Sequence, residues 1–354
     1  MRAVWLREFG APEVLALGEA PDPVAAPGQV VVDVEFVNIT FIETQFRATG
    51  AGPFAATLPM IPGNGVGGVV SSVGTGVAPD LVGTRVITST GGTGAYAERV
   101  AVSADAVFHV PDALALDTAV ALLADGRTAT MMTRAAAIEP GERVLVEAAA
   151  GGVGSLLVQL AKAAGARVVA AVGGPRKAEV AMRLGAEFAV DYTDNGTADR
   201  TNDGTTDRAA DGTNSGEDNG RNDGRNDSVD GGWAKRVRDA VGAVDMVFDG
   251  VGGAIARTAF ELLDRGGRMV SFGLASGSWV EIEETEATSR GITLVRPSAT
   301  PAELRAYTES ALTEAAEGRL HPIIGQRFPL AQAAAAHAAI QSRATIGKTL
   351  LETR

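Results

Sequence analysis

The chain has 354 residues, a formal net charge of −12 and 45% hydrophobic residues. That length allows two domains of ordinary size, each with its own core. The sequence contains no cysteine, which excludes disulfides, thiol catalysis and thiolate-bound zinc. The acidic balance argues against a nucleic-acid partner, which would require a basic face on the protein.

The sequence shows neither a membrane segment nor an export signal. No apolar run reaches the roughly 18 residues needed to span a bilayer. The amino-terminal MRAVWLREFGAPEVL lacks the apolar core and the small-residue cleavage site of a signal peptide. We therefore expect no membrane partner and a cytoplasmic location. The histidines, His109, His321 and His337, have no metal-ligand spacing, and we expect structural roles for them.

The first part of the chain, residues 1–110, has the pattern of a small β-barrel or sandwich. Short β-branched runs separated by glycines cover residues 30–39, 65–74 and 85–92, and the strand pattern resumes over 95–102. From Leu116 to about Ile138, alanine, leucine and methionine recur at the spacing of a helix.

After Pro140, strands and helices alternate. The pattern predicts strands over residues 143–148, 167–172, 188–192, 244–253, 268–273 and 292–297, and helices over 152–165, 177–186 and 259–267. Such alternation is typical of a parallel, doubly wound sheet in an α/β fold. Two more helices, at 303–318 and 330–342, and a last short strand at 348–352 complete the expected elements.

Residues 194–232 interrupt this alternation. The segment is rich in Asp, Asn and Gly, and Val229 and three alanines are its only apolar residues. It therefore cannot bury enough apolar surface to offset the entropy of ordering. A calcium loop is the alternative, but such loops need a fixed ligand register and usually an apolar anchor or a bidentate Glu, and neither is present here. We expect a solvated, disordered insertion between a strand and a helix.

A glycine cluster marks the expected turn from the strand at 143–148 to the helix at 152–165. Gly151, Gly152, Val153 and Gly154 stand in the context in which such a motif binds a dinucleotide. Glycine lets the backbone approach a pyrophosphate, and the helix amino terminus supplies amide donors and a favourable dipole. The alternative is a tight turn that only packs the helix on the strand.

The end of the next strand favours NADP(H) over NAD(H). A dinucleotide fold that prefers NAD carries an acid there for the ribose hydroxyls. This chain has Gly173 instead, followed by Arg176 and Lys177. A solvated cation at a helix start is the alternative, but the helix dipole does not favour it there. A cation in this place is better explained by a neighbouring 2′-phosphate.

Several motifs together resemble one known family. FGAPEVL, PGNGVGGVVSSVGTGV, GAYAERV, EAAAGGVGSLLVQLAKAAGA, VFDGVGG, GRMVSFG and SRATIGK cover nearly the whole chain except 194–232. They are similar to the zinc-independent quinone oxidoreductases (the ζ-crystallin-like group) of the medium-chain dehydrogenase/reductase superfamily. The resemblance implies a β-rich GroES-like catalytic domain from 1–124 and 298–354, a doubly wound Rossmann domain from 125–297, and an active site between them.

The resemblance also assigns roles to single residues. Lys177, Tyr192 and Arg343 match positions where the family holds the adenosine 2′-phosphate, although Tyr192 could merely pack at a strand end and Arg343 could be a solvated cap. Thr128 matches a threonine near the nicotinamide amide. Phe272 and Gly273 match the turn under the nicotinamide. The family commonly forms homodimers through an edge strand, here expected around residues 292–297.

Two departures from relatives bear on the chemistry. Zinc relatives carry a His-Glu pair where this chain has Asn64 and Gly65, so we expect no metal and no Lewis acid for alcohol oxidation. In the first active-site loop, Thr40 stands where the family usually has asparagine, and Gln45 where tyrosine is common. Gln45 can donate a hydrogen bond but not a proton, which argues against an enoyl-thioester reductase.

These observations predict hydride transfer from NADPH to an acceptor that is already electrophilic, a quinone or a similar conjugated carbonyl. The protein would bind, orient and donate hydrogen bonds, with Thr40, Gln45 and Thr128 as candidate donors, and water could supply the final proton. An NADPH-dependent enone or enoyl reductase is the first alternative. The second is an NADPH-binding structural or sensor protein with little turnover.

Overall fold

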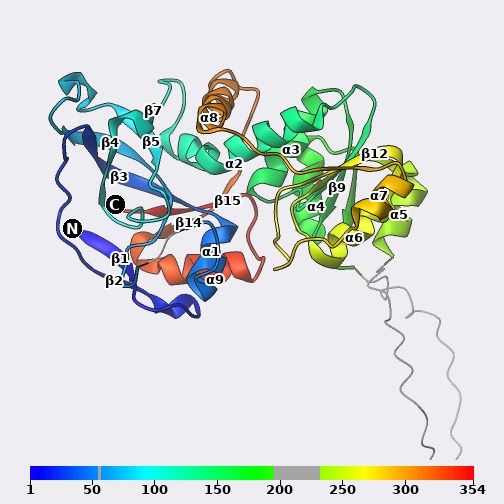
Figure 1. The fold of residues 1–354 in the computed structure, drawn as a ribbon, viewed down its shortest axis with the longest axis horizontal. Coiled ribbons are helices and arrows are strands. Elements are labelled where there is room, and N and C mark those ends of the chain that lie inside the picture. Colours follow the sequence, from blue (N-terminus) through cyan, green and yellow to red (C-terminus); the bar gives the residue numbers. More distant parts are fainter. Residues whose placement is uncertain (55–56, 195–231) are drawn as a thin grey trace, which may run out of the picture.

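The computed structural model describes residues 1–54, 57–194 and 232–354. Figure 1 shows two lobes side by side, one containing both chain termini and the other built from the middle of the chain. The expected solvated insertion at 194–232 lies outside the described residues, apart from its two end residues. No helix of the described ranges is long and apolar enough to cross a membrane.

A seven-stranded sheet forms the lobe that contains the termini. Its strand order is β14-β15-β3-β4-β5-β7, and β6 pairs with β3. The strands are β3 (Gln29–Ile39), β4 (Gly65–Val73), β5 (Arg85–Ser89), β6 (Arg99–Ser103), β7 (Val107–His109), β14 (Ile324–Pro329) and β15 (Lys348–Glu352). Beside the sheet lie the antiparallel pair β1 (Arg2–Leu6) and β2 (Leu15–Glu19), and the helices α1 (Phe41–Thr49) and α9 (Ala333–Gln341). Because β15 pairs with β3, the two ends of the chain build one sheet.

The second lobe is a six-stranded parallel sheet with the order β10-β9-β8-β11-β12-β13. Its strands are β8 (Arg143–Glu147), β9 (Arg167–Val172), β10 (Phe188–Asp191), β11 (Val244–Asp249), β12 (Leu263–Ser271) and β13 (Thr293–Val295). The chain winds outward from β8 in one direction and from β11 in the other, so the prediction of a doubly wound sheet is confirmed. Ligands of such sheets bind beyond the carboxyl ends of the strands, at the point where the winding reverses. Here that point lies between β8 and β11.

The helices of this lobe are α3 (Gly152–Ala163), α4 (Pro175–Leu184), α5 (Trp233–Val241), α6 (Gly253–Glu261) and α7 (Glu284–Ser289). Two longer helices, α2 (Leu116–Ala136) and α8 (Pro301–Ala316), lie where the two lobes meet (Figure 1). Local sequence explains where α4 begins and ends. Proline at its first position has a preset helical φ, and Gly185 ends it in the left-handed region at φ 112°.

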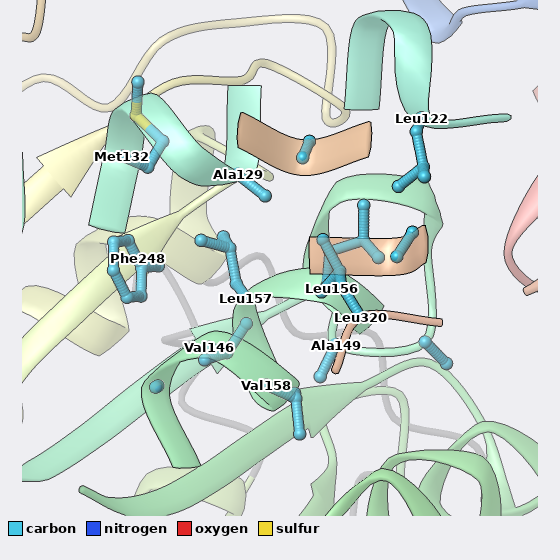
Figure 2. Close-up of a cluster of buried hydrophobic side chains, with 14 of the residues drawn as sticks. Leu122, Ala129, Met132, Val146, Ala149, Leu156, Leu157, Val158, Phe248 and Leu320 are labelled. Atoms are coloured by element: carbon cyan, nitrogen blue, oxygen red, sulfur yellow. The ribbon is translucent and has the colours of Figure 1, made fainter. Parts of the chain in front are cut away.

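One buried cluster fixes how α2, α3 and the parallel sheet meet (Figure 2). Leu122 and Ala129 of α2 lie with Leu156 and Leu157 of α3 above β8 and β11, and each of these four side chains is at most 1% exposed. Leu122 and Ala129 are seven positions apart and so share one helix face, which also includes residue 125. That face of α2 is therefore held against α3.

Two predicted elements differ from the structure. The helix predicted at 259–267 is misplaced, because α6 ends at Glu261 and β12 begins at Leu263. Leu263 pairs with Val244 of β11, and Gly266 takes φ 85°, which a helix interior does not allow. The loop expected around residues 38–45 contains the start of α1, whose first turn is closed by a capping box.

Other elements were shorter than expected or missed. The strand pattern over 95–102 forms a strand only from Arg99. The sequence reading omitted β1, β2, β14, α5 and α7, none of which is longer than nine residues. The proposed domain boundary at residues 124 and 125 falls inside α2, a helix that packs against both sheets. The domain limits remain a proposal.

Candidate functional site

The glycine turn lies at the carboxyl end of β8, as the motif predicts. Gly151 is the N-cap of α3, and its carbonyl accepts from the Ser155 amide at 2.9 Å. A Cβ on Gly154 would lie 2.2 Å from the backbone oxygen of Ala148, so the helix can approach the strand this closely only with glycine there. The amides of the first helical turn have no partner within the helix and point outward, as an anion site requires.

Glycine is needed at positions 151, 152 and 154 for different local reasons. A Cβ on Gly152 would lie 2.0 Å from Oδ2 of Asp125, whereas the closest atom to a Cβ on Gly151 is a backbone oxygen at 3.1 Å. Packing therefore requires Gly152 and Gly154. Gly151 has more space around it, which is what a turn that admits a ligand needs.

The residues expected to hold a 2′-phosphate come together at the carboxyl ends of β9 and β10. Lys177 of α4 donates from Nζ to the backbone oxygen of Arg343 at 2.6 Å. Arg343 in turn donates from Nη2 to the backbone oxygen of Ala275 at 2.7 Å. A Cβ on Gly173 would lie 3.3 Å from the Tyr192 ring, which places that ring beside the strand end. We call Lys177, Tyr192 and Arg343 the rim cluster.

Electrostatics of the rim cluster fit an anionic ligand. Burial, and then the nearby Arg343 guanidinium, lower the pKa of Lys177. Burial, and then Glu147, raise the pKa of Tyr192 to about 12, so its hydroxyl stays a hydrogen-bond donor. Arg343 also has φ 56°, an unfavourable backbone conformation for a residue other than glycine. Two neighbouring cations, one of them on a strained backbone, are an arrangement that a phosphate dianion would stabilise.

The turn at Phe272 and Gly273 follows β12 and packs against the turn that follows β11. A Cβ on Gly273 would lie 2.6 Å from the backbone oxygen of Gly250, and a Cβ on Gly250 would lie 2.8 Å from the Phe272 ring. The Phe272 amide also donates to the Asp249 carbonyl at 2.9 Å. The turn expected under the nicotinamide therefore packs on a second turn at the carboxyl edge of the sheet.

Beneath these turns lie two acids that sequence reasoning missed. Glu147 ends β8, Asp249 ends β11, and both are 0% exposed. Each carboxylate accepts from the Val251 amide, at 3.1 and 3.2 Å, and Asp249 also accepts from the Gly252 amide at 2.8 Å. The sequence signal that could have revealed them is an acid at the end of each of two apolar strands. Because β8 and β11 are parallel neighbours, both acids lie where the winding of the sheet reverses.

The surroundings of this carboxyl pair favour the protonated form of Glu147. Among the described residues, Oε1 of Glu147 and Oδ2 of Asp249 are buried without a hydrogen-bond partner. Burial, and then the charge of Asp249, raise the pKa of Glu147 well above its usual range. A protonated Glu147 that donates to Asp249 satisfies both carboxyls and leaves one negative charge for the amides of the turn.

The candidate donors lie on α1 and α2. Thr40 directs its hydroxyl and its backbone N–H at the Glu43 carboxylate, at 2.6 and 2.7 Å. Thr128 donates its hydroxyl to the Ala124 carbonyl at 2.9 Å. The side chain of Gln45, in α1, is half-buried. In the part of the chain that the structure describes, no hydrogen bond joins any two of these three side chains. Each hydroxyl would have to exchange its present bond to donate to a substrate.

Glu43 is a further residue of this region that the sequence reading did not single out. Its side chain is buried and accepts from the Asn64 amide at 3.0 Å, in addition to Thr40. Burial raises its pKa, against the opposing effects of Thr40 and Lys348. Glu43 therefore ties the start of α1 to the segment before β4.

Comparisons with known proteins agree with this architecture. Residues 26–112 match the alcohol dehydrogenase GroES-like domain, and residues 184–351 match a family model described as zinc-binding dehydrogenase. A probable quinone oxidoreductase of Schizosaccharomyces pombe is 33% identical, over 98% of this chain and 96% of the relative. The chain belongs to the quinone oxidoreductase family of the medium-chain dehydrogenase/reductase superfamily. This confirms the family and the fold class inferred from the sequence.

Two other members of the superfamily are informative. The crystal structure of the Escherichia coli quinone oxidoreductase, solved with NADPH, matches with a TM-score of 0.81 and 29% identity, over 99% of this chain and 100% of that one. A 2-haloacrylate reductase of a Burkholderia species is 27% identical, over 99% of this chain and 97% of the relative.

In this quinone oxidoreductase family member, the segment where zinc relatives carry a His-Glu pair is closely packed. A Cβ on Gly65 would lie 2.5 Å from Nδ2 of Asn38, so a larger side chain there would require Asn38 to move. The Asn64 amide is engaged by Glu43. The described residues contain no group of three or more His, Asp and Glu side chains placed to hold a metal ion.

The histidines lie apart from the glycine turn and the rim cluster. His109 and His321 are exposed. His337 of α9 is buried, with Nε2 2.7 Å from the Tyr96 hydroxyl. Burial, and then Arg47, lower the pKa of His337 to about 3, so this imidazole is neutral and belongs to the core of the β-rich lobe.

Proposed function

We propose that the protein is an NADPH-dependent oxidoreductase that transfers a hydride to a quinone or a similar conjugated carbonyl without zinc. The curated relatives that carry the name quinone oxidoreductase support this activity, and so do the relatives whose structures contain NADPH. The observation that carries it in this chain is the rim cluster. Lys177, Tyr192 and Arg343 meet beside the glycine turn with the charge that a 2′-phosphate needs.

We propose that different residues of the site bind different parts of the cofactor. The turn over Gly151, Gly152, Val153 and Gly154 would hold the pyrophosphate at the start of α3. Gly173 would leave room for the adenosine ribose beside Tyr192. Thr128, Phe272 and Gly273 would line the nicotinamide end. NADPH, when bound, supplies the hydride.

The chain's own contribution to the reaction is binding, orientation and hydrogen bonding. A conjugated acceptor takes up the incoming charge on its own oxygen, so donors near that oxygen suffice to stabilise it. Thr40, Gln45 and Thr128 are the proposed donors. Water is proposed to supply the final proton, since Gln45 cannot.

A cofactor titration tests the proposal. Binding of NADPH and NADH to the purified protein would be followed by fluorescence and repeated with Lys177→Ala. We expect tight NADPH binding in the wild type and, in the variant, an NADPH affinity that falls to that of NADH. Lys162→Ala, which removes an exposed lysine of α3, is the matched control and should change neither affinity. Equal affinity of the wild type for both cofactors would refute the roles of Lys177, Tyr192 and Arg343.

An acceptor screen then separates the candidate activities. The 2-haloacrylate reductase relative favours one further candidate, an NADPH-dependent reductase of activated C=C bonds in enones or acrylates. Quinones and enones would be compared by the loss of NADPH absorbance. Faster turnover of enones would favour that second activity. Tight NADPH binding without turnover of any acceptor would favour a structural or sensor protein.

Two further properties are proposed with this function. β13 is an edge strand of the six-stranded sheet, and we propose that it pairs with its copy to form a homodimer. Light scattering would give the mass of the particle in solution, and a monomer at micromolar concentration would contradict the proposal. A cytoplasmic location remains the prediction made from the sequence.

A further inference from the structure

A buried ion pair lies where the two lobes meet. Lys348, the first residue of β15, places Nζ 3.0 Å from Oδ1 of Asp125, which lies in the middle of α2. The side chains are 4% and 10% exposed. The residues are 223 positions apart in the sequence, and no local pattern links them. Burying both charges is costly, so a pair that only held the lobes together could be replaced by apolar side chains.

Asp125 also touches the glycine turn. Its second oxygen, Oδ2, lies where it would be 2.0 Å from a Cβ on Gly152, the first residue of α3. The face of α2 that carries Asp125 is pressed onto α3 by Leu122 and Ala129 (Figure 2). A carboxylate is thus fixed beside the helix end that the proposed function gives to the pyrophosphate. Two anions at one helix end repel each other unless a cation lies between or beside them.

Lys348 is placed to supply that cation, and its charge also reaches Glu43, which holds the proposed donor Thr40. The backbone next to it continues the contact between the lobes, because the Gly347 amide donates to the Ala150 carbonyl at 2.7 Å. Its ammonium group also lowers the pKa of the buried Glu43, which holds Thr40. Arg127, two residues further along α2, is a second cation near Asp125, and it is half-buried.

We propose that Lys348 is a positioning residue for the cofactor, which neutralises Asp125 beside the glycine turn and so permits the pyrophosphate to bind there. The inference rests on the proposed function, in which this turn binds the dinucleotide. In this arrangement the Asp125 carboxylate holds the Lys348 ammonium group in place, and the ammonium group balances the charge of the carboxylate. Since every nicotinamide dinucleotide has the pyrophosphate, the effect must be the same for NADPH and NADH.

The test is a double-mutant cycle. Lys348→Met keeps the length of the side chain, Asp125→Asn keeps the shape of its partner, and the double variant contains both changes. Dissociation constants for NADPH and NADH would be measured by fluorescence, at a temperature where circular dichroism shows each variant folded. We expect Lys348→Met to weaken both cofactors by the same factor, about tenfold or more, because it removes the only cation that the described structure places in contact with the Asp125 carboxylate. The double variant should return to within about threefold of the wild type.

Three results would overturn the proposal: unchanged cofactor affinity in Lys348→Met, a double variant as weak as the single one, or a loss confined to NADPH. Should Lys348→Met not fold, Asp125→Asn alone decides the question. It removes the repelling charge, so both cofactors should bind at least as tightly as in the wild type, and weaker binding would reject the idea. Lys162→Met, an exposed lysine of α3 with the same change of charge, is the control.

The outcome is distinguishable from a failure of the proposed function. If the wild type binds neither cofactor, the function is wrong and the cycle has no baseline. If the wild type binds both and Lys177→Ala loses only its preference for NADPH, the function stands. The response of Lys348→Met then judges the further inference alone.

Discussion

The candidate site at the carboxyl edge of the parallel sheet has two parts, a floor and a rim, that differ in how they carry charge. The floor consists of Gly154, Glu147 and Asp249, which are buried and engaged by backbone groups. The rim consists of Arg176 and the rim cluster, whose cations lie at or near the surface. In the floor, burial favours the protonated, uncharged form of Glu147, whereas the rim collects positive charge.

This difference predicts two kinds of response to mutation. A change in the floor removes contacts that the folded chain needs in the absence of any ligand, so it should lower the free energy of unfolding. A change in the rim removes positive charge that attracts an anion, so it should lower affinity and leave folding intact. Four substitutions test whether this separation holds.

Gly154→Ala should have the largest effect, because its Cβ would lie 2.2 Å from the backbone oxygen of Ala148. Backbone cannot move aside as a side chain can, and overpacking of this kind costs roughly 1–3 kcal/mol in the free energy of unfolding. Urea denaturation would measure it. Gly151→Ala is the matched control, since its nearest contact is at 3.1 Å, and should cost less than half as much. Equal losses at both positions would contradict the packing argument.

Glu147→Gln should change how stability depends on pH. Because folding raises the pKa of Glu147, the folded chain holds a proton that the unfolded chain releases above about pH 4.3. The stabilising effect is complete below that pH and is lost as pH rises toward the folded-state pKa. Within this window the wild type should lose about 1.4 kcal/mol per pH unit relative to Glu147→Gln.

Urea titrations of both proteins at pH 5 and pH 8 would give this difference. Glu187→Gln is the control, because its Arg167 partner lowers the pKa of Glu187 and moves its titration below the window. Parallel pH profiles for the wild type and Glu147→Gln would mean that the carboxyl pair does not share a proton.

How much of this candidate site the sequence could predict depends on how far apart in the sequence the contacting residues lie. The glycine turn and the rim residues Gly173 and Lys177 belong to one strand–helix–strand unit, whose alternation of apolar runs and glycines is local and easily recognised. The contact of Val251 with Glu147 spans 104 residues, and that of Lys348 with Asp125 spans 223. Only the order of strands in the sheet brings such groups together, and no local pattern contains it.

The same reason explains the misplaced helix at 259–267. Its residues have helical character in isolation, but pairing of Leu263 with Val244 turns them into the start of β12. Tyr192 and Arg343 were found only through resemblance to a family, since neither has a local signal of its own. Resemblance did not reach Lys348 as a charge partner, because its partner lies on a different element.

Arg343→Gly should separate stability from binding in the rim. Arg343 has φ 56°, and glycine adopts this conformation without strain, so the variant should be more stable by about 0.5–1 kcal/mol. NADPH affinity should fall, because the guanidinium is gone, while NADH affinity should stay the same. Thermal unfolding and fluorescence titration would give the two quantities. Ala137→Gly, at φ 48° at the end of α2, is the control and should show the gain in stability without any change in affinity. A loss of stability in Arg343→Gly would mean that Arg343 stabilises the folded chain, as the floor residues do.

Arg176→Ala should have the smallest effect, and it defines the outer limit of the rim. Arg176 precedes Lys177 in α4, but its side chain is exposed, whereas Lys177 is half-buried and held by the Arg343 carbonyl. A solvated cation is screened by salt and adds little to the binding of an anion. We expect its removal to weaken NADPH binding by no more than about twofold at 0.15 M salt, with a larger change at low salt. A loss as large as that of Lys177→Ala would show that both cations contact the phosphate, and that burial is not what separates binding groups from solvated ones here.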